Sequence, residues 1–125
     1  MNRPKLSVKF YRSDAHREPV REWLRALDEA DRKTIGDEIR LVQFGWPVGM
    51  PLVRKMQPDL WEIRITLAGR IARVLFTVQA GDAVLLHGFI KKSPNTPGAE
   101  LQTARNRLKK ILRQPDLWRV TWHAH

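Results

Sequence analysis

The sequence contains no cysteine and no apolar run of the length that a membrane helix needs. Without cysteine, disulfides, thiolate metal ligands and a thiol nucleophile are excluded. A membrane-spanning helix takes about 20 consecutive apolar residues, so a transmembrane segment is excluded as well. The first residues, MNRPKLSVKF, lack the apolar stretch of a signal peptide. We therefore expect a cytoplasmic protein.

Acidic residues are scarce compared with basic ones. The 125 residues include 13 Asp and Glu against 23 Lys and Arg, which gives a formal net charge of +10. This length suits one domain with a modest core, and a hydrophobic content of 42% is that of a globular chain. The positive charge favours a nucleic-acid backbone, an anionic membrane or an acidic protein as partner. For a small basic protein, RNA is the favoured polyanion.

Several motifs of catalysis and cofactor binding are also missing. There is no glycine-rich phosphate loop and no GxSxG nucleophile elbow. The HAH ending brings His123 and His125 together, but no third ligand is spaced to complete a metal site. We therefore expect no metal and no small-molecule cofactor.

The apolar pattern predicts a single domain over residues 1–113. Three interpretations stay open for the extension at 114–125: an edge strand, a docked segment or a segment ordered by a partner. Alternating apolar residues predict strands at 5–11, 60–67, 71–79 and 84–90. Apolar residues at helical spacing predict a first helix over about residues 18–30 and two more that begin near residues 31 and 97, with Thr96 as the cap of the last. The proline-rich segment 46–59 is predicted to be an irregular loop. The order β-α-α-β-β-β-α predicts an α+β domain in which helices cover one face of a small, mainly antiparallel sheet.

Two arginines lie inside the predicted strands. Period-two alternation puts Arg64 on the face opposite Trp61 and Ile63, which belong to the core. Arg73 shares a face with apolar neighbours, where a charge is costly unless it is paired or exposed. Two interpretations remain open at this point: an ion pair of either arginine with Glu62, or the binding of a phosphate, which a guanidinium fork suits well.

A basic loop follows the last predicted strand. Lys91 and Lys92 stand between that strand and the N-terminus of a helix, whose backbone donors also favour anions. A solvated basic loop is the alternative. We predict that the cations Arg64, Arg73, Lys91 and Lys92 line one cleft, and that the further RNA contacts are Arg54, Lys55 and Arg70. A catalytic role of the first four is implied only by the family resemblance described below.

The histidines provide two candidates for acid and base chemistry. His87 alternates with apolar residues in the last strand, a pattern more typical of a hydrogen-bonded core residue than of a catalyst. His123 lies in the C-terminal extension and would have to fold back to reach the cleft. The predicted acid/base group therefore stays open between His87, His123 and the two lysines.

The chain resembles the RelE/HigB superfamily of bacterial toxins, and within it the phage-derived HigB-like branch. The resemblance covers about residues 8–108 and rests on the segments REPVREWLRAL, FGWPVGMPLVRKM, LWEIRI, RIARVLFTV and LLHGFIKKSPNTP. The last is similar to the family's FxKKxxKTP ending, with Asn95 in place of a lysine. We do not extend the predicted binding site to that position, because one positive charge is lost there.

This resemblance implies a RelE-like fold and a ribosome-dependent endoribonuclease that cuts mRNA without a metal. It also implies a cognate antitoxin, often a helix-turn-helix protein. By position, Arg64 resembles the family's strand cation near the reacting phosphate, and Arg73 a cation on the adjoining strand. Lys91 and Lys92 match the basic position after the last strand. Relatives often carry an acid/base His or Tyr near the C-terminus, whereas the single tyrosine here is Tyr11.

Two other functions remain open on the sequence. A ParE-like toxin shares the expected fold but inhibits DNA gyrase instead of cutting RNA. A non-catalytic protein that binds RNA or the ribosome, such as a phage remnant, would carry the same basic surface.

Overall fold

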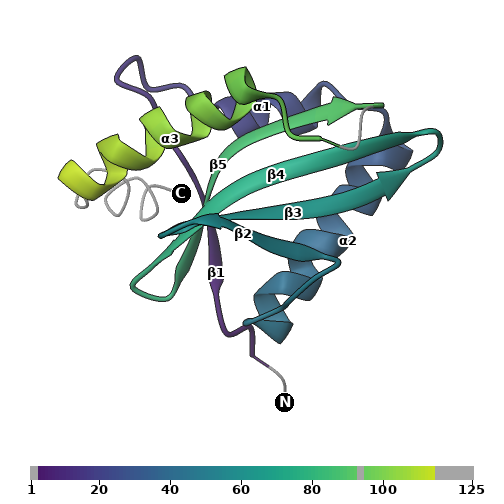
Figure 1. The fold of residues 1–125 in the computed structure, drawn as a ribbon, viewed down its shortest axis with the longest axis horizontal. Coiled ribbons are helices and arrows are strands. Elements are labelled where there is room, and N and C mark those ends of the chain that lie inside the picture. The colour runs from purple at the N-terminus through teal and green to yellow at the C-terminus, as the bar shows by residue number, and fades with distance from the viewer. Residues whose placement is uncertain (1–2, 93–94, 115–125) are drawn as a thin grey trace.

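A computed structural model describes residues 3–92 and 95–114 of the chain. Its elements are β1 (Ser7–Phe10), α1 (Pro19–Arg25), α2 (Glu29–Gly45), β2 (Val53–Gln57), β3 (Leu60–Leu67), β4 (Arg70–Gln79), β5 (Asp82–Lys91) and α3 (Gly98–Arg113). The strands form one sheet in the order β1-β5-β4-β3-β2 (Figure 1). β1 runs parallel to β5, and the other neighbouring strands are antiparallel. The predicted α+β fold class is confirmed.

One strand lies where the sequence predicts a loop. β2 occupies part of segment 46–59 and pairs with β3, with Val53 opposite Ile63. Its five residues give little alternation, prolines flank it on both sides, and its register shifts between Lys55 and Gln57. A strand this short and irregular leaves no clear period-two signal. The element order is therefore β-α-α-β-β-β-β-α.

The first two helices also begin and end at other residues than expected. α1 ends at Arg25, whereas the sequence predicts a helix to about residue 30, and α2 begins at Glu29. The Arg32 side chain donates to the carbonyl oxygen of Arg25 at 3.3 Å. A side-chain donor at this end satisfies a carbonyl that has no partner within the helix. This contact joins the end of α1 to the first turn of α2.

Helices cover both faces of the sheet, so the prediction of a single covered face is wrong (Figure 1). α1 and α2 pack on the face formed by Ile63, Val74 and Leu85. α3 packs on the opposite face, where Leu108 contacts the cluster that contains Leu75 and Leu86. The two alternating residue sets of β3, β4 and β5 thus serve two separate cores. No helix within residues 3–92 and 95–114 is long and apolar enough to cross a membrane.

Close packing holds α1 against the central part of β5. A Cβ built on Gly88 would lie 2.3 Å from the Trp23 ring, so the ring needs the space that glycine leaves. At the other end of the same core, Trp46 contacts Trp61 edge-on with 5.2 Å between ring centroids. These aromatic contacts hold α1 and Trp46 against the face of the sheet that α1 and α2 cover.

Candidate functional site

The strand register brings the main predicted cations to one face. Arg64 lies directly opposite Arg73 between β3 and β4, and Lys91 lies opposite Ile71 between β4 and β5. Because directly paired residues share a face, Arg64, Arg73 and Lys91 all lie on the α3 side of the sheet. Lys92 follows the end of β5 and is exposed. The same register excludes an arrangement with Arg64 and Arg73 on opposite faces.

Arg73 is the innermost cation of this face. Its side chain is only 1% exposed, and its Nε lies 3.7 Å from the Glu62 carboxylate. The Phe89 ring centroid is 6.0 Å from its guanidinium carbon. Burial lowers the pKa of Arg73, Glu62 raises it, and the nearby Arg64 lowers it again. An arginine stays charged under such shifts, so this is a buried ion pair.

Glu62 connects the sheet to the segment that leads into α3. It is 3% exposed, and one of its carboxylate oxygens accepts a hydrogen bond from the Thr96 hydroxyl at 2.5 Å. The sequence predicts Thr96 as the cap of the last helix. In the structure the N-cap is Pro97 and makes no side-chain capping bond. The Thr96 hydroxyl donates to the Glu62 carboxylate instead, because Thr96 lies one position before the N-cap of α3.

A small cavity opens beside Glu62. Its volume is about 150 Å³, and its lining consists of Met50, Pro51, Arg54, Glu62 and Arg64. Arg54 lies directly opposite Glu62, so it projects to the same face. Both arginines are exposed, whereas the carboxylate is buried. Two accessible guanidinium groups around one held carboxylate can bind a phosphate and orient a nearby hydroxyl group.

Two predicted RNA contacts lie on the other face. Lys55 pairs with Trp61, and its ammonium lies 5.7 Å from the centroid of that ring. Arg70 pairs with Leu67 and forms an ion pair with Asp31 of α2 at 3.0 Å. The structure therefore does not bring Lys55 and Arg70 to the cavity beside Glu62. Of the three predicted RNA contacts, only Arg54 lines this cavity. Alternation in β2 could not reveal this, because the sequence predicts a loop there.

His87 is held on both sides by residues of α3. Its Nε2 lies 2.8 Å from a Glu100 carboxylate oxygen, and its Nδ1 lies 3.3 Å from the Arg107 guanidinium. Arginine only donates, so in a neutral ring Nδ1 accepts and Nε2 carries the proton toward Glu100. With both nitrogens engaged, His87 joins β5 to α3, in line with the structural interpretation of its sequence pattern. The other histidine candidate, His123, lies outside the described residues.

Glu100 and Arg107 have roles that the sequence argument missed. They are seven positions apart on α3, which puts them on one helix face, the same spacing that relates Leu101 to Leu108. Arg107 also donates to the Leu86 carbonyl oxygen at 2.8 Å, and burial lowers its pKa, with Tyr11 raising it. The helical spacing indicates that Glu100 and Arg107 share a face of α3. Only the packing of α3 on the sheet shows that this face contacts His87.

The fold and the site define a small α+β protein with a cationic cavity at one sheet edge. Residues 22–109 match the sequence profile of the phage-derived protein Gp49-like family (DUF891). This match spans more than half of the chain, and the chain belongs to this family. The family is associated with RelE/HigB-like toxins, and the matched region runs from α1 into α3. A comparison with curated proteins finds no match.

Proposed function

We propose that the protein is the toxin of a type II toxin-antitoxin system and cuts mRNA on the ribosome. The observation that carries this proposal is the cavity in which two exposed arginines, Arg54 and Arg64, flank the buried carboxylate of Glu62. The net charge of +10 adds a long-range attraction for RNA. The resemblance to RelE/HigB toxins and the family membership support the same function.

The proposed reaction uses the RNA itself as the nucleophile. The 2′-oxygen attacks the adjacent phosphorus and gives its proton to solvent water, and the bond from phosphorus to the 5′-oxygen breaks. The products are a 2′,3′-cyclic phosphate and a 5′-hydroxyl, which takes up a proton. Arg64 and Arg54 stabilise the negative charge that grows on the phosphate, and this electrostatic contribution is typically the largest one in such reactions.

The remaining groups have supporting roles in this proposal. Arg73 is too buried to contact the phosphate in this conformation, and we assign it the role of holding Glu62. Lys91 and Lys92 lie on the path proposed for the RNA, and we assign to their ammonium groups the donation of a proton to the leaving oxygen. The proposed partners are mRNA on the ribosome and a cognate helix-turn-helix antitoxin.

The test is expression of the chain in a translating extract, with primer extension to map the mRNA ends. We expect cuts in phase with codons, and we expect Arg64→Ala to slow them by about 100-fold, since one transition-state donor is worth that much. Arg40→Ala is the matched control, because it removes the same charge from an exposed position on α2. This control variant should cut at the unchanged rate.

Two results would overturn the proposal. Intact mRNA together with a loss of gyrase supercoiling activity would identify a ParE-like toxin. Intact mRNA with normal gyrase, while the chain still binds ribosomes, would identify a non-catalytic binding protein. Equal cutting by the Arg64→Ala variant would leave the toxin function standing but remove the assigned cavity from the mechanism.

A further inference from the structure

The cavity beside Glu62 is too small to enclose a whole nucleotide. Its volume is about 150 Å³, whereas pockets that enclose a small molecule measure about 300–1,000 Å³. The charged part of its lining, Arg54, Glu62 and Arg64, suits a phosphate group. When an RNA phosphate is bound there, the base that belongs to it therefore lies outside the cavity, at its rim.

Met50 provides apolar surface at this rim. It lines the cavity and is 76% exposed, the highest value among the exposed large hydrophobic residues of the described part of the chain. Pro51, the other apolar residue of the lining, follows it directly and is exposed as well. An apolar side chain that stays in water adds little to the stability of the fold. The surface of Met50 is therefore available for a ligand of the same cavity.

Two backbone hydrogen bonds hold the turn that carries Met50. The Val53 N–H donates to the Gly49 carbonyl oxygen at 3.1 Å and closes this turn. The Arg64 N–H donates to the Leu52 carbonyl oxygen at 2.8 Å and ties the same turn to β3. The backbone of Met50 is thus fixed relative to the strand that carries Arg64. A contact surface that is already in place loses less conformational freedom when a ligand binds.

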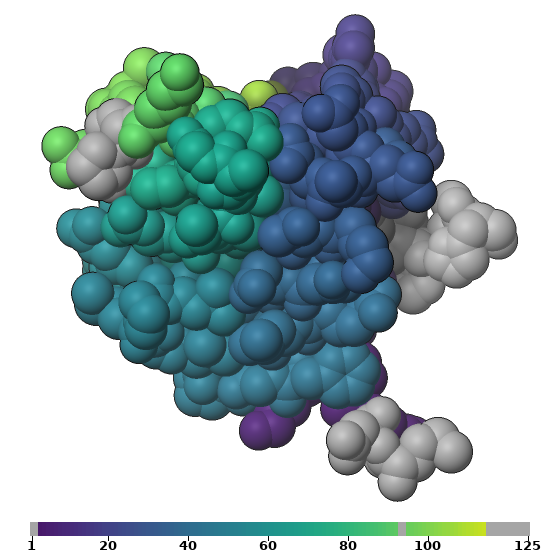
Figure 2. All heavy atoms as spheres, turned by 90° about the vertical axis from the view of Figure 1, so that its right-hand side faces the viewer, coloured from purple at the N-terminus to yellow at the C-terminus, as the bar shows by residue number. Residues whose placement is uncertain are grey.

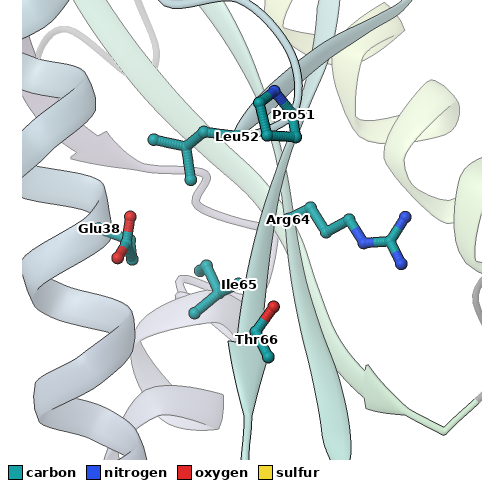
Figure 3. Close-up of a pocket in the computed structure, with 6 residues that line it drawn as sticks. All are labelled: Glu38, Pro51, Leu52, Arg64, Ile65 and Thr66. Atoms are coloured by element: carbon teal, nitrogen blue, oxygen red, sulfur yellow. The ribbon is translucent and has the colours of Figure 1, made fainter.

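The guanidinium of Arg64 is directed to this cavity and away from α2. Figure 3 shows its side chain extending to the side of the sheet opposite Glu38, so that carboxylate does not compete with a phosphate for it. α2 and the β3–β4 turn, which border this end of the sheet, come to the surface together in Figure 2. Since Arg54, Arg64 and Met50 are all exposed, an RNA chain can reach the cavity from outside.

We propose that Met50 is the platform on which an unpaired RNA base stacks while Arg54 and Arg64 hold the adjoining phosphate. Methionine sulfur packs favourably against aromatic rings, and Pro51 extends the apolar contact. Every base has such a face, so the platform accepts all four bases. Bases inside a duplex are already stacked on their neighbours, so the ligand is single-stranded RNA. This inference rests on the proposed function and adds to it a binding residue and the strandedness of the substrate.

The test measures how tightly the full chain binds an RNA that it cannot cut. A short, fluorescein-labelled 2′-O-methyl RNA strand lacks the free 2′-hydroxyl that the proposed reaction needs, so its fluorescence anisotropy reports binding alone. At low salt we expect Met50→Ala to weaken binding by about five- to tenfold. Met50→Leu should stay within about twofold of the unchanged chain, because leucine is apolar and similar in volume. Leu41→Ala is the matched control, since it removes another exposed apolar side chain, on α2, and it should not change the affinity.

An abasic strand with the same backbone separates the role of Met50 from that of the arginines. It should bind the unchanged chain more weakly than the strand with bases. Met50→Ala should not weaken the abasic strand further, because both changes remove the same contact. Arg64→Ala should weaken both strands by the same factor, since it acts on the phosphate. Binding of a duplex of the same sequence should not depend on Met50.

The inference and the proposed function fail in different ways. The inference is wrong if Met50→Ala leaves the affinity for the strand with bases unchanged, or if it weakens the abasic strand or the duplex equally. It is also wrong if the unchanged chain does not bind the uncleavable strand at low salt. The absence of cuts in the translating extract overturns the proposed function instead. The uncleavable strand still measures the contact with Met50 in that case, because its binding requires no cleavage.

Discussion

The sheet face on the α3 side has two halves that differ in what covers them. In the covered half, α3 buries Leu75 and Leu86 under Leu108. In the open half, Arg54 and Arg64 stay exposed around a cavity. The ion pair of Glu62 and Arg73 lies at the boundary between them. The comparison shows that two adjacent arginines of the same face can serve different purposes, one inside the structure and one at its surface.

The largest expected effect comes from removing the ion pair of Glu62 and Arg73 at that boundary. Glu62→Ala removes the carboxylate beside buried Arg73, and we expect the free energy of unfolding in urea to fall by about 3–5 kcal/mol. Glu62→Gln is the control, because its amide oxygen still accepts the bond from Thr96. It should be less damaging than alanine. A loss below about 1 kcal/mol for Glu62→Ala would mean that the open half does not depend on this pair.

The second prediction weakens the covered half alone. Leu108→Ala leaves a cavity under α3 and should cost about 2–4 kcal/mol, measured by chemical denaturation. Leu112→Ala, four positions further along the same helix, removes a side chain that is 47% exposed. It should change stability by less than about 0.5 kcal/mol. Similar losses for both variants would show that α3 does not pack as described.

A third change tests whether His87 has a structural role in the covered half or an acid/base role in mRNA cleavage. His87→Ala removes the contacts to Glu100 and Arg107 and should cost about 1–2 kcal/mol of stability. Glu100→Ala should lower the free energy of unfolding by a similar amount. The double variant should lower it by less than the sum, because both substitutions remove the same contact between His87 and Glu100. mRNA cleavage should be unchanged. A folded His87→Ala protein without cleavage would reinstate His87 as an acid or base.

The smallest effect is expected on the opposite face. Arg70→Ala removes a partly exposed ion pair with Asp31, which should cost about 0.2–1 kcal/mol and less at high salt. RNA affinity should stay the same, because this guanidinium points to α2. Arg54→Ala is the comparison variant, and it should weaken RNA binding. Equal losses of RNA affinity for both variants would place RNA on both faces of the sheet.

Much of the sheet was predictable because strand signals are local. Alternation in β3 and β4 correctly separated Trp61 and Ile63 from Arg64, and it put Arg73 with Ile71 and Leu75. β2 escaped prediction because its pairing with β3, and not its own pattern, makes it a strand. The side on which α3 packs was also beyond the sequence, since an amphipathic helix fits either face of a sheet until the chain path is known.

The candidate site was predictable only in part for the same reason. Arg64 was identified from its strand, and Lys91 from the basic loop predicted after the last strand. The surroundings of Arg73 depend on Glu62 and Thr96, which are 34 positions apart. Lys55 and Arg70 were grouped with the cleft by closeness in sequence, and the register turns both to the other face. Contacts between distant segments decide which cations are accessible, and no local period encodes them.

The sequence by itself determined the α+β class, the alternating faces of the long strands, and the excess of positive charge. These follow from short-range patterns and from composition, which need no knowledge of contacts. Only the tertiary structure decided that Arg73 is buried while Arg64 is exposed, and that His87 is bound to α3. Exposure and pairing arise where distant segments meet, so packing settles them.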